Sequence, residues 1–120
     1  LNGGGGSDLL LGASGNDILV GGAGNDVLSA AGGADTFRFL ETSGGHANFG
    51  KDIVVDFHPG EDNVEISQTA FATFAALQAA TADDGHGNAV ITADANNTIT
   101  LMGVSKADVI AHQSDFHLLA

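Results

Sequence analysis

Large apolar residues recur every nine positions at the start of the chain, each inside a short run of strand-forming residues. Leu10, Leu19, Leu28 and Phe37 are the middle residues of LLL, ILV, VLS and TFR. A strand sends alternate side chains to opposite faces, so these four side chains are predicted to fill one interior. Strands of three residues are stable only when copies stack beside one another, so the pattern predicts a coil of short parallel strands.

The residues between the triplets are polar and rich in glycine, and they keep the same phase. The units 3–11, 12–20, 21–29 and 30–38 place glycine at positions one, two and four and aspartate at position six, with only Ala13, Ala30 and Ala31 departing. Glycine tolerates a positive φ, so these residues predict tight turns whose carbonyl groups point inward. Leu1 and Asn2 fit the end of a preceding unit, so we expect a longer array. A glycine-rich linker or a metal-free solenoid is the alternative, but a linker does not keep phase over four units.

The charge of the chain restricts its partners. The chain has fifteen acidic and three basic residues, which gives a formal net charge of −12, and it contains no cysteine. A protein this acidic is a poor ligand for nucleic acid or for anionic membrane surfaces. The sequence contains no apolar stretch of the roughly 20 residues that a membrane span needs. Since self-repulsion opposes a compact state, a bound cation is expected to supply the missing positive charge.

The repeat spacing places acidic residues above one another. If two units make one turn of the coil, successive turns lie about 4.8 Å apart, so Asp8 stacks on Asp26 and Asp17 on Asp35. Two carboxylates roughly 5 Å apart repel by about 3 kcal/mol at an effective dielectric constant of 20. A calcium ion between the rows reverses this sign because its ligands sit at about 2.3–2.6 Å, whereas magnesium requires about 2.1 Å.

The segments GGGGSD, GASGND and GGAGND resemble the calcium-binding nonapeptides of the RTX (repeats-in-toxin) family. The resemblance implies a parallel β-roll in which the turns at both edges bind calcium. The implied side-chain ligands are Asp8, Asp17, Asp26 and Asp35. The implied carbonyl ligands come from Gly4, Gly6, Gly15, Gly22, Gly24 and Gly33. Because Ala30 and Ala31 replace two glycines, the site at Asp17 and Asp35 is expected to be distorted or incomplete.

After residue 39 the chain contains less glycine, and longer strands and a helix are predicted. We expect a loop over 42–50, strands over 52–57 and 63–67 with Val64 and Ile66 on one face, and a helix capped by Ser67 or Thr69 and ending at residue 80. A turn over 82–88, a hairpin of AVITAD and TITLMGV, one helical turn at SKADV and a closing strand follow. The predicted fold is all-β: a β-roll over 1–40, then a β-sandwich-like cap with one or two short helices over 41–120, packed as one unit.

Two further segments carry a resemblance. DIVVDFHPGEDNVEIS is similar to the segment that follows the β-roll in serralysin-type proteases, and DFHLLA resembles their uncleaved type I secretion signals. In this family's terms, Asp52, Asp56 and Asp62 are candidates for a further calcium site, with solvated strand-end carboxylates as the alternative. The five histidines lack the spacing of a zinc site, apart from the pair His112 and His117, and scattered surface histidines explain them better.

Several apolar residues of the repeats are predicted to face outward. They are Leu9, Leu11, Ile18, Val20 and Val27, which is too apolar a set for a sheet that faces water. We expect the helix near residues 69–80 or an upstream domain to cover them, with a second copy of the chain as the other option.

These residues allow three functions. The favoured one is a calcium-dependent folding and type I secretion module of a larger secreted, extracellular bacterial protein, with calcium ions, the secretion machinery and an upstream domain as partners. The alternative is a calcium-dependent adhesin or polysaccharide-binding module, which the absence of Trp and Tyr and the three cationic residues disfavour. A catalytic fragment would need a nucleophile or an acid and base pair, and the spacing identifies none, so we do not expect an enzyme.

Overall fold

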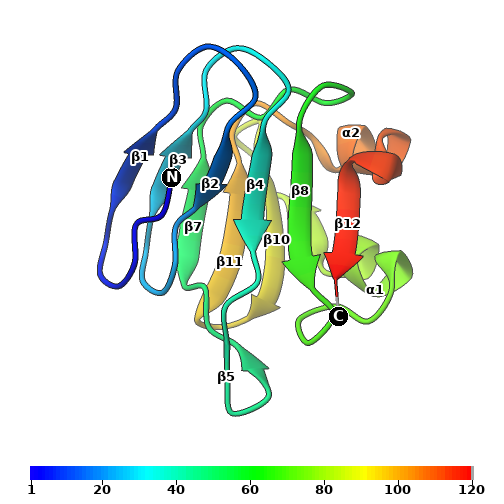
Figure 1. Cartoon of the computed structure of the whole chain (residues 1–120). Helices are drawn as coiled ribbons and strands as arrows, with labels where there is room; N and C mark the ends of the chain where they lie inside the picture. The colour runs from blue at the N-terminus through cyan, green and yellow to red at the C-terminus, as the bar shows by residue number, and fades with distance from the viewer. Residues whose placement is uncertain (120) are drawn as a thin grey trace.

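A computed structural model describes residues 1–119, and Ala120, the last residue of the predicted cap and closing strand, lies outside the described residues. The fold is mostly short strands with two short helices (Figure 1). None of the helices between residues 1 and 119 is long and apolar enough to cross a membrane. The elements are β1 (Leu9–Leu11), β2 (Ile18–Val20), β3 (Val27–Ser29), β4 (Thr36–Phe39), β5 (Thr42–Ser43), β6 (His46–Ala47), β7 (Lys51–Val54), β8 (Asn63–Ser67), α1 (Phe74–Ala79), β9 (Thr81–Asp83), β10 (Ala89–Asp94), β11 (Asn97–Leu101), α2 (Lys106–Ala111), a 3₁₀ turn (Gln113–Asp115) and β12 (Phe116–Leu119).

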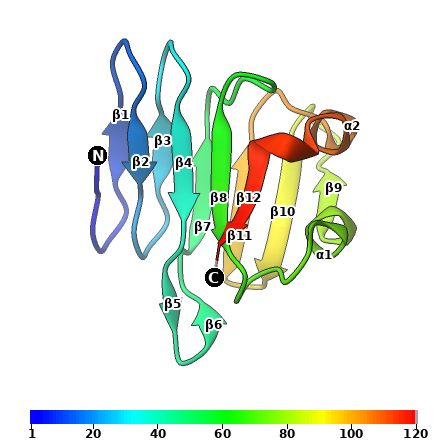
Figure 2. The ribbon, with the colours of Figure 1, turned by 45° about the vertical axis from the view of Figure 1, so that its right-hand side comes forward.

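The four repeat strands alternate between two sheets. β1 pairs in parallel with β3, with Leu10 opposite Leu28, and β2 pairs in parallel with β4, with Leu19 opposite Phe37. Each partner lies 18 residues further along the chain, so two nonapeptides make one turn, as the spacing predicts. Figure 2 shows the four strands side by side, with the glycine-rich turns above and below them.

The same two ladders continue beyond the repeats. β7 adds in parallel to β3 and β11 to β7, while β8 adds in parallel to β4 and β12 to β8. Two facing layers do result, as expected of a sandwich-like cap, but the strands of the second half extend the sheets of the first instead of building sheets of their own. Antiparallel pairing occurs where β10 and β9 follow β11, and in the small β5–β6 hairpin within the predicted loop 42–50.

The interior is filled by the residues that the nine-residue pattern singles out. Leu19, Leu28 and Phe37 are fully buried, whereas Leu10 is half-buried because it lies in the outermost strand. Val54 and Val64, which pair with Leu28 and Phe37, continue the same two columns. The core then widens through a chain of aromatic rings that joins Phe37, Phe57, Phe116 and Phe74 at centroid distances of 5.8–6.4 Å.

The predicted hairpin and the second predicted helix are confirmed. β10 and β11 pair in antiparallel fashion, and α2 starts at a capping box in which Ser105 and Asp108 exchange hydrogen bonds of 3.1 Å. The predicted start of the first helix is wrong. The carbonyl of Ser67 accepts hydrogen bonds from the N–H groups of Ala70 and Phe71, which form a separate turn. The helix α1 begins later, because the side chain of Thr73 caps it by accepting a hydrogen bond from the N–H of Ala76.

The apolar outer face of the first strands stays exposed. Leu9 and Leu11 retain 64% and 63% of their accessible surface, and Ile18 retains 46%. The helix α1 packs against β9, β10 and α2 at the opposite end of the sheets (Figure 2), so the prediction that it covers these residues is wrong. The physical reason is connectivity: α1 follows β8 in the chain and therefore lies where the ladders end.

Candidate metal centre

Aspartates line both edges of the stacked turns in two columns. Asp8, Asp26 and Asp52 stand at matching positions at the start of β1, β3 and β7, and we call them the first row. Asp17, Asp35 and Asp62 precede β2, β4 and β8 in the same way, and we call them the second row. The parallel register therefore produces the stacking predicted for the four repeats and adds one aspartate to each row.

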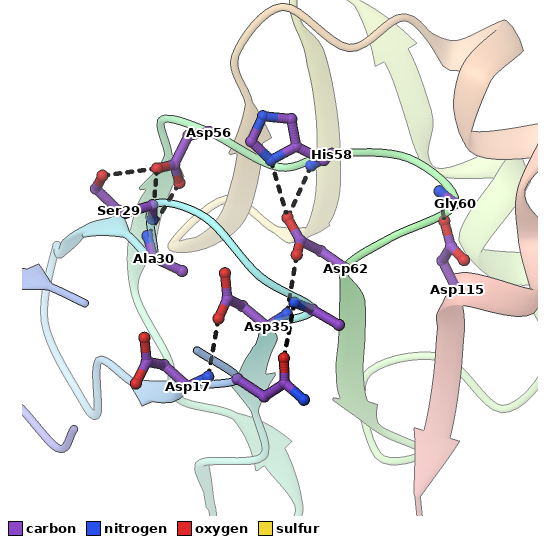
Figure 3. A network of polar contacts seen from close by, with 12 residues as sticks. Asp17, Ser29, Ala30, Asp35, Asp56, His58, Gly60, Asp62 and Asp115 are labelled. Atoms are coloured by element: carbon purple, nitrogen blue, oxygen red, sulfur yellow. Dashed lines mark hydrogen bonds and ion pairs between the residues drawn. The ribbon is translucent and has the colours of Figure 1, made fainter. Parts of the chain in front are cut away.

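The same hydrogen bond recurs between neighbouring members of a row. The backbone N–H of Asp8 donates to Oδ1 of Asp26 and that of Asp26 to Oδ1 of Asp52, both at 2.8 Å. In the second row, the backbone N–H of Asp17 donates to Oδ1 of Asp35 at 2.8 Å, and the backbone N–H of Asp35 donates to Oδ1 of Asp62 at 2.9 Å (Figure 3). One carboxylate oxygen of each downstream residue is thus fixed on the preceding turn, which holds the side chain in place.

The second carboxylate oxygen is left without a partner in most of these residues. Among the residues that the structure describes, the buried side-chain oxygens lacking a hydrogen bond are Oδ2 of Asp8, Asp26, Asp35 and Asp52 and Oε2 of Glu41. A buried, unpaired polar atom costs about 1–3 kcal/mol, and more when it carries charge. Oxygens placed in this way are suited to bind a cation, which supplies the missing partner.

Burial also makes the negative charge of the rows unfavourable when no cation is bound. Burial raises the pKa of Asp26 above its usual value, and the charge of Asp8 adds to this. It likewise raises the pKa of Asp35, helped by the charges of Asp62 and Asp17, and it raises the pKa of Asp52 to about 8. Without a cation the charged form of these carboxyl groups is therefore unfavourable, and a bound cation would relieve that cost.

Glycine is required where one turn lies on the next. Gly22, Gly24 and Gly33 have φ values of +87°, +109° and +104°, and a Cβ on them would collide with the carbonyl oxygens of Gly4, Gly6 and Gly15, respectively. Those three carbonyls, all predicted calcium ligands, therefore lie against the following turn. A Cβ on Gly3 would meet both Oδ2 of Asp8 and the carbonyl oxygen of Gly21 at 2.7 Å, so carboxylate and carbonyl oxygens share one narrow space.

The donors in this space are all oxygen atoms, which is the ligand set of a hard cation. Calcium takes six to eight oxygen ligands and accepts irregular geometry. Within residues 1–119, no three His, Cys, Asp or Glu side chains are grouped so that they could hold a metal ion by themselves. A cation bound between the turns therefore needs the backbone carbonyls as well as the aspartates.

The fourth turn contains alanine where the other repeats have glycine, and whether its calcium site is distorted or incomplete stays a prediction. Ala31 keeps the conformation of a glycine, with φ +68°, and is the one non-glycine residue with positive φ in the described chain. Asp56 holds this turn, because its carboxylate accepts bonds from the N–H groups of Ala30 and Ala31 at 3.0 and 2.9 Å and from Oγ of Ser29 at 2.8 Å (Figure 3). In the second row, Oδ2 of Asp17 accepts a hydrogen bond of 3.1 Å from the N–H of Ala13.

The structure does not bring Asp52, Asp56 and Asp62 together, although the resemblance to serralysin-type proteases suggests one further calcium site formed by them. Asp52 extends the first row, and Asp56 is occupied by the fourth turn. Asp62 extends the second row, but its Oδ2 accepts a bond from the N–H of His58 at 2.9 Å and lies 3.4 Å from Nδ1 of the same histidine (Figure 3). Each of the three therefore has different surroundings.

Two further repeat units are recognisable once the rows are known. ANFGKDIVV (47–55) and FHPGEDNVE (57–65) carry glycine at position four, aspartate at position six and valine at position eight. Gly50 and Gly60 both have positive φ, like the glycines at position four of the repeats. The nine-residue pattern does not reveal these units, because Asp52 follows Asp35 by 17 residues and Asp62 follows Asp52 by ten, which breaks the phase.

Comparison with known proteins assigns the first part of the chain. Residues 2–37 match the model of the RTX calcium-binding nonapeptide repeat in four copies. This segment consists of RTX repeats. The RTX repeats imply that the cofactor is Ca²⁺, in agreement with the unpaired oxygens of the rows. No curated protein sequence matches the chain.

Solved structures show that the fold extends beyond the RTX repeats. The extracellular lipase LipA from Serratia marcescens is similar over 95% of this chain, with a TM-score of 0.67 and 20% identity. The AlgE6R3 subunit of the Azotobacter vinelandii mannuronan C5-epimerase is similar over 95% of this chain and 79% of its own, with a TM-score of 0.56 and 24% identity. The chain spans 20% of the length of the lipase, so the likeness concerns one part of that enzyme.

Proposed function

We propose that the chain is a calcium-dependent folding and type I secretion module of a larger extracellular bacterial protein. The observation that carries the proposal is the set of buried carboxylate oxygens without partners, which are Oδ2 of all three aspartates of the first row and of Asp35 in the second row. These oxygens come together only when the turns stack, so the calcium site does not exist in the unfolded chain. Calcium binding is then coupled to folding, and its binding free energy becomes folding free energy.

The direction of the switch follows from charge. The chain has a formal net charge of −12, and its rows place like charges on successive turns, so the folded state is disfavoured when calcium is scarce. Extracellular calcium sites bind at roughly 0.1–1 mM, well above cytosolic calcium concentrations. The module would therefore remain unfolded inside the cell and close into a calcium-loaded β-roll outside it.

The position of the C-terminal segment supports a role in export. Its strand β12 pairs with β8, and Phe116 is buried against Phe57 and Phe74. A secretion signal within this segment would be accessible to the export machinery only while the sheet is open. The RTX repeats and the likeness to an extracellular lipase support a secreted location.

A polysaccharide-binding module is the second candidate, because the chain shares its fold with a subunit of a mannuronan C5-epimerase. An acidic glycan would need basic residues, and the chain has three, of which Arg38 is bonded to Glu65 at 2.6 Å. Calcium-dependent binding to acidic glycans, measured on a glycan array, would favour this candidate over a folding and export module.

A titration followed by far-UV circular dichroism tests the coupling of folding to calcium. After chelation, the chain should give the spectrum of an unfolded protein and convert to a β spectrum as calcium is added, with a much weaker response to magnesium. Asp26→Asn should need more calcium, whereas Glu61→Gln, which removes one exposed charge from the turn before β8, should behave like the wild type. A chelated chain with full β structure would contradict the proposal.

Export can be measured separately. A passenger protein fused to the whole chain should reach the medium of cells that carry a type I secretion system. Removal of residues 113–120 should abolish this export without changing the amount of protein made. Equal export of both fusions would remove the secretion role while leaving calcium-dependent folding intact.

A further inference from the structure

We propose that two copies of the calcium-loaded chain form a weak dimer through the outer face of the sheet that contains β1, β3, β7 and β11. This sheet is one of the two layers in Figure 1. Its outward apolar side chains, which we call the apolar face, are Leu9, Leu11, Val27, Ile53, Val55 and Met102. The inference requires the calcium-loaded fold of the proposed function, but it is independent of the export role.

One row of outward side chains crosses this sheet in register. Leu9 lies opposite Val27, and Val27 lies opposite Ile53. The row continues through Thr100 of β11 to Val90 of β10. Neighbouring strands are about 4.8 Å apart, so these side chains form one continuous strip. The strip contains no charged residue.

The apolar face is exposed along most of its length. Five of the seven large apolar residues that are exposed in the described chain belong to it. Ile53, Val55 and Met102 retain 38%, 39% and 42% of their accessible surface. Val55 and Met102 directly follow β7 and β11, and their N–H groups still bond to the carbonyls of Leu28 and Val54, respectively. The strand alternation therefore continues to them and keeps them on the outer side.

The face is also free of negative charge, although the chain has fifteen acidic residues. The structure describes β1, β3, β7 and β11 in full, and their outward positions carry one charged residue, Lys51 at the start of β7. The outer face of the other sheet is different. There Arg38, Glu65 and His117 lie in register on neighbouring strands, and Arg38 is bonded to Glu65 at 2.6 Å. The two outer faces thus differ in polarity.

This distribution of charge favours a second copy as the occupant. A cationic partner would be attracted to the acidic edges of the roll and not to this face, and an acidic partner would be repelled by the net charge of −12. A second copy offers an identical surface without negative charge. Two sheets can then pack face to face about 10 Å apart, with one two-fold axis relating them. The rows of aspartates remain at the edges of both rolls.

The size of the face limits the strength of the dimer. Four strands of about 4.8 Å each and five residues of about 3.3 Å each give a face of about 300 Å². Exposed apolar patches of about this size on monomeric proteins are often functional. A stable complex buries about 800 Å² on each partner, so this face supports a weak dimer with a dissociation constant on the order of 0.1 mM.

Sedimentation equilibrium of the full chain in saturating calcium tests the inference. The average mass should rise toward twice that of the monomer as the protein concentration increases. Leu9→Asp should raise the dissociation constant about tenfold or more. The matched control is Ile18→Asp, which adds the same charge at the same repeat position of an exposed residue on the other sheet, and it should dimerise like the wild type.

The salt dependence gives a second readout. The two copies carry charge of the same sign, and salt screens this repulsion over a distance of about 10 Å at 0.1 M. Sodium chloride should therefore strengthen the dimer at constant saturating calcium. An interface held by ion pairs between the copies would weaken instead, and that result would overturn the inference.

The outcomes separate the dimer from the proposed function. Circular dichroism shows whether the chain folds in saturating calcium, and a chain that does not fold would overturn both proposals. A folded chain that stays monomeric up to about 1 mM overturns the inference alone. Equal weakening by Leu9→Asp and Ile18→Asp would also overturn it, because added charge would then explain the effect. If Leu9→Asp does not fold, Ile53→Asp at the centre of the same face decides in its place.

Discussion

Gly22 offers a sharp test of how closely the turns must stack. It is buried, it has φ +87°, and a Cβ on it would run into the carbonyl oxygen of Gly4, which belongs to the preceding turn of the same edge. In Gly22→Ala, the left-handed backbone alone costs about 1–2 kcal/mol. The collision adds about 1–3 kcal/mol, the usual cost of overpacking. The sum is a large part of the stability of a small domain, about 5–15 kcal/mol.

The assay is thermal unfolding in saturating calcium, together with the calcium titration. At this chain length about 1 kcal/mol moves the melting temperature by roughly 4 °C, so Gly22→Ala should melt about 10 °C or more below the wild type. It should also need more calcium to fold, because the displaced carbonyl of Gly4 is a predicted ligand.

Two other positions in the repeats serve as controls for Gly22→Ala. Gly5→Ala adds the same methyl group where φ is not positive and where nothing lies within 4 Å, so it should be neutral or slightly stabilising. Ala31→Gly relieves the φ of +68° at the equivalent position of the fourth unit and should stabilise by about 0.5–1 kcal/mol, after the entropy of glycine is subtracted. A Gly22→Ala variant that melts with the wild type in saturating calcium would refute the close stacking of turns.

Three further measurements address other parts of the molecule. Asp56→Asn should destabilise the calcium-loaded chain by about 1–3 kcal/mol in urea unfolding, because it disrupts the bonds to the fourth turn; fewer bound ions in calorimetry would instead make Asp56 a ligand. Ser105→Ala should cost about 1 kcal/mol by loss of the capping box, equally at every calcium concentration that folds the chain. Burial raises the pKa of Asp52 to about 8, against about 3.9 in an unfolded chain, so the ion-free fold loses stability as the pH rises from about 4 to 8. Metal-free protein should therefore show more β structure at pH 5 than at pH 8, and identical spectra would contradict this.

Much of the repeat segment could be predicted from the sequence because every relevant contact follows from local spacing. A strict period of nine residues with two units per turn places Leu28 on Leu10 and Asp26 on Asp8, whatever the rest of the chain does. The glycines at position four could be predicted for the same reason, since glycine adopts the positive φ without strain and leaves room for the close carbonyl of the neighbouring turn.

The second half depended on long-range pairing that no local period encodes. The insertion between β4 and β7 breaks the phase, so the alignment of Asp52 with Asp26 is set by the pairing of β7 with β3. The same holds for α1, whose place at the far end of the sheets leaves Leu9 and Leu11 exposed. Spacing alone thus positions residues within a regular coil, whereas the contacts formed after an irregular insertion arise only when distant strands pair.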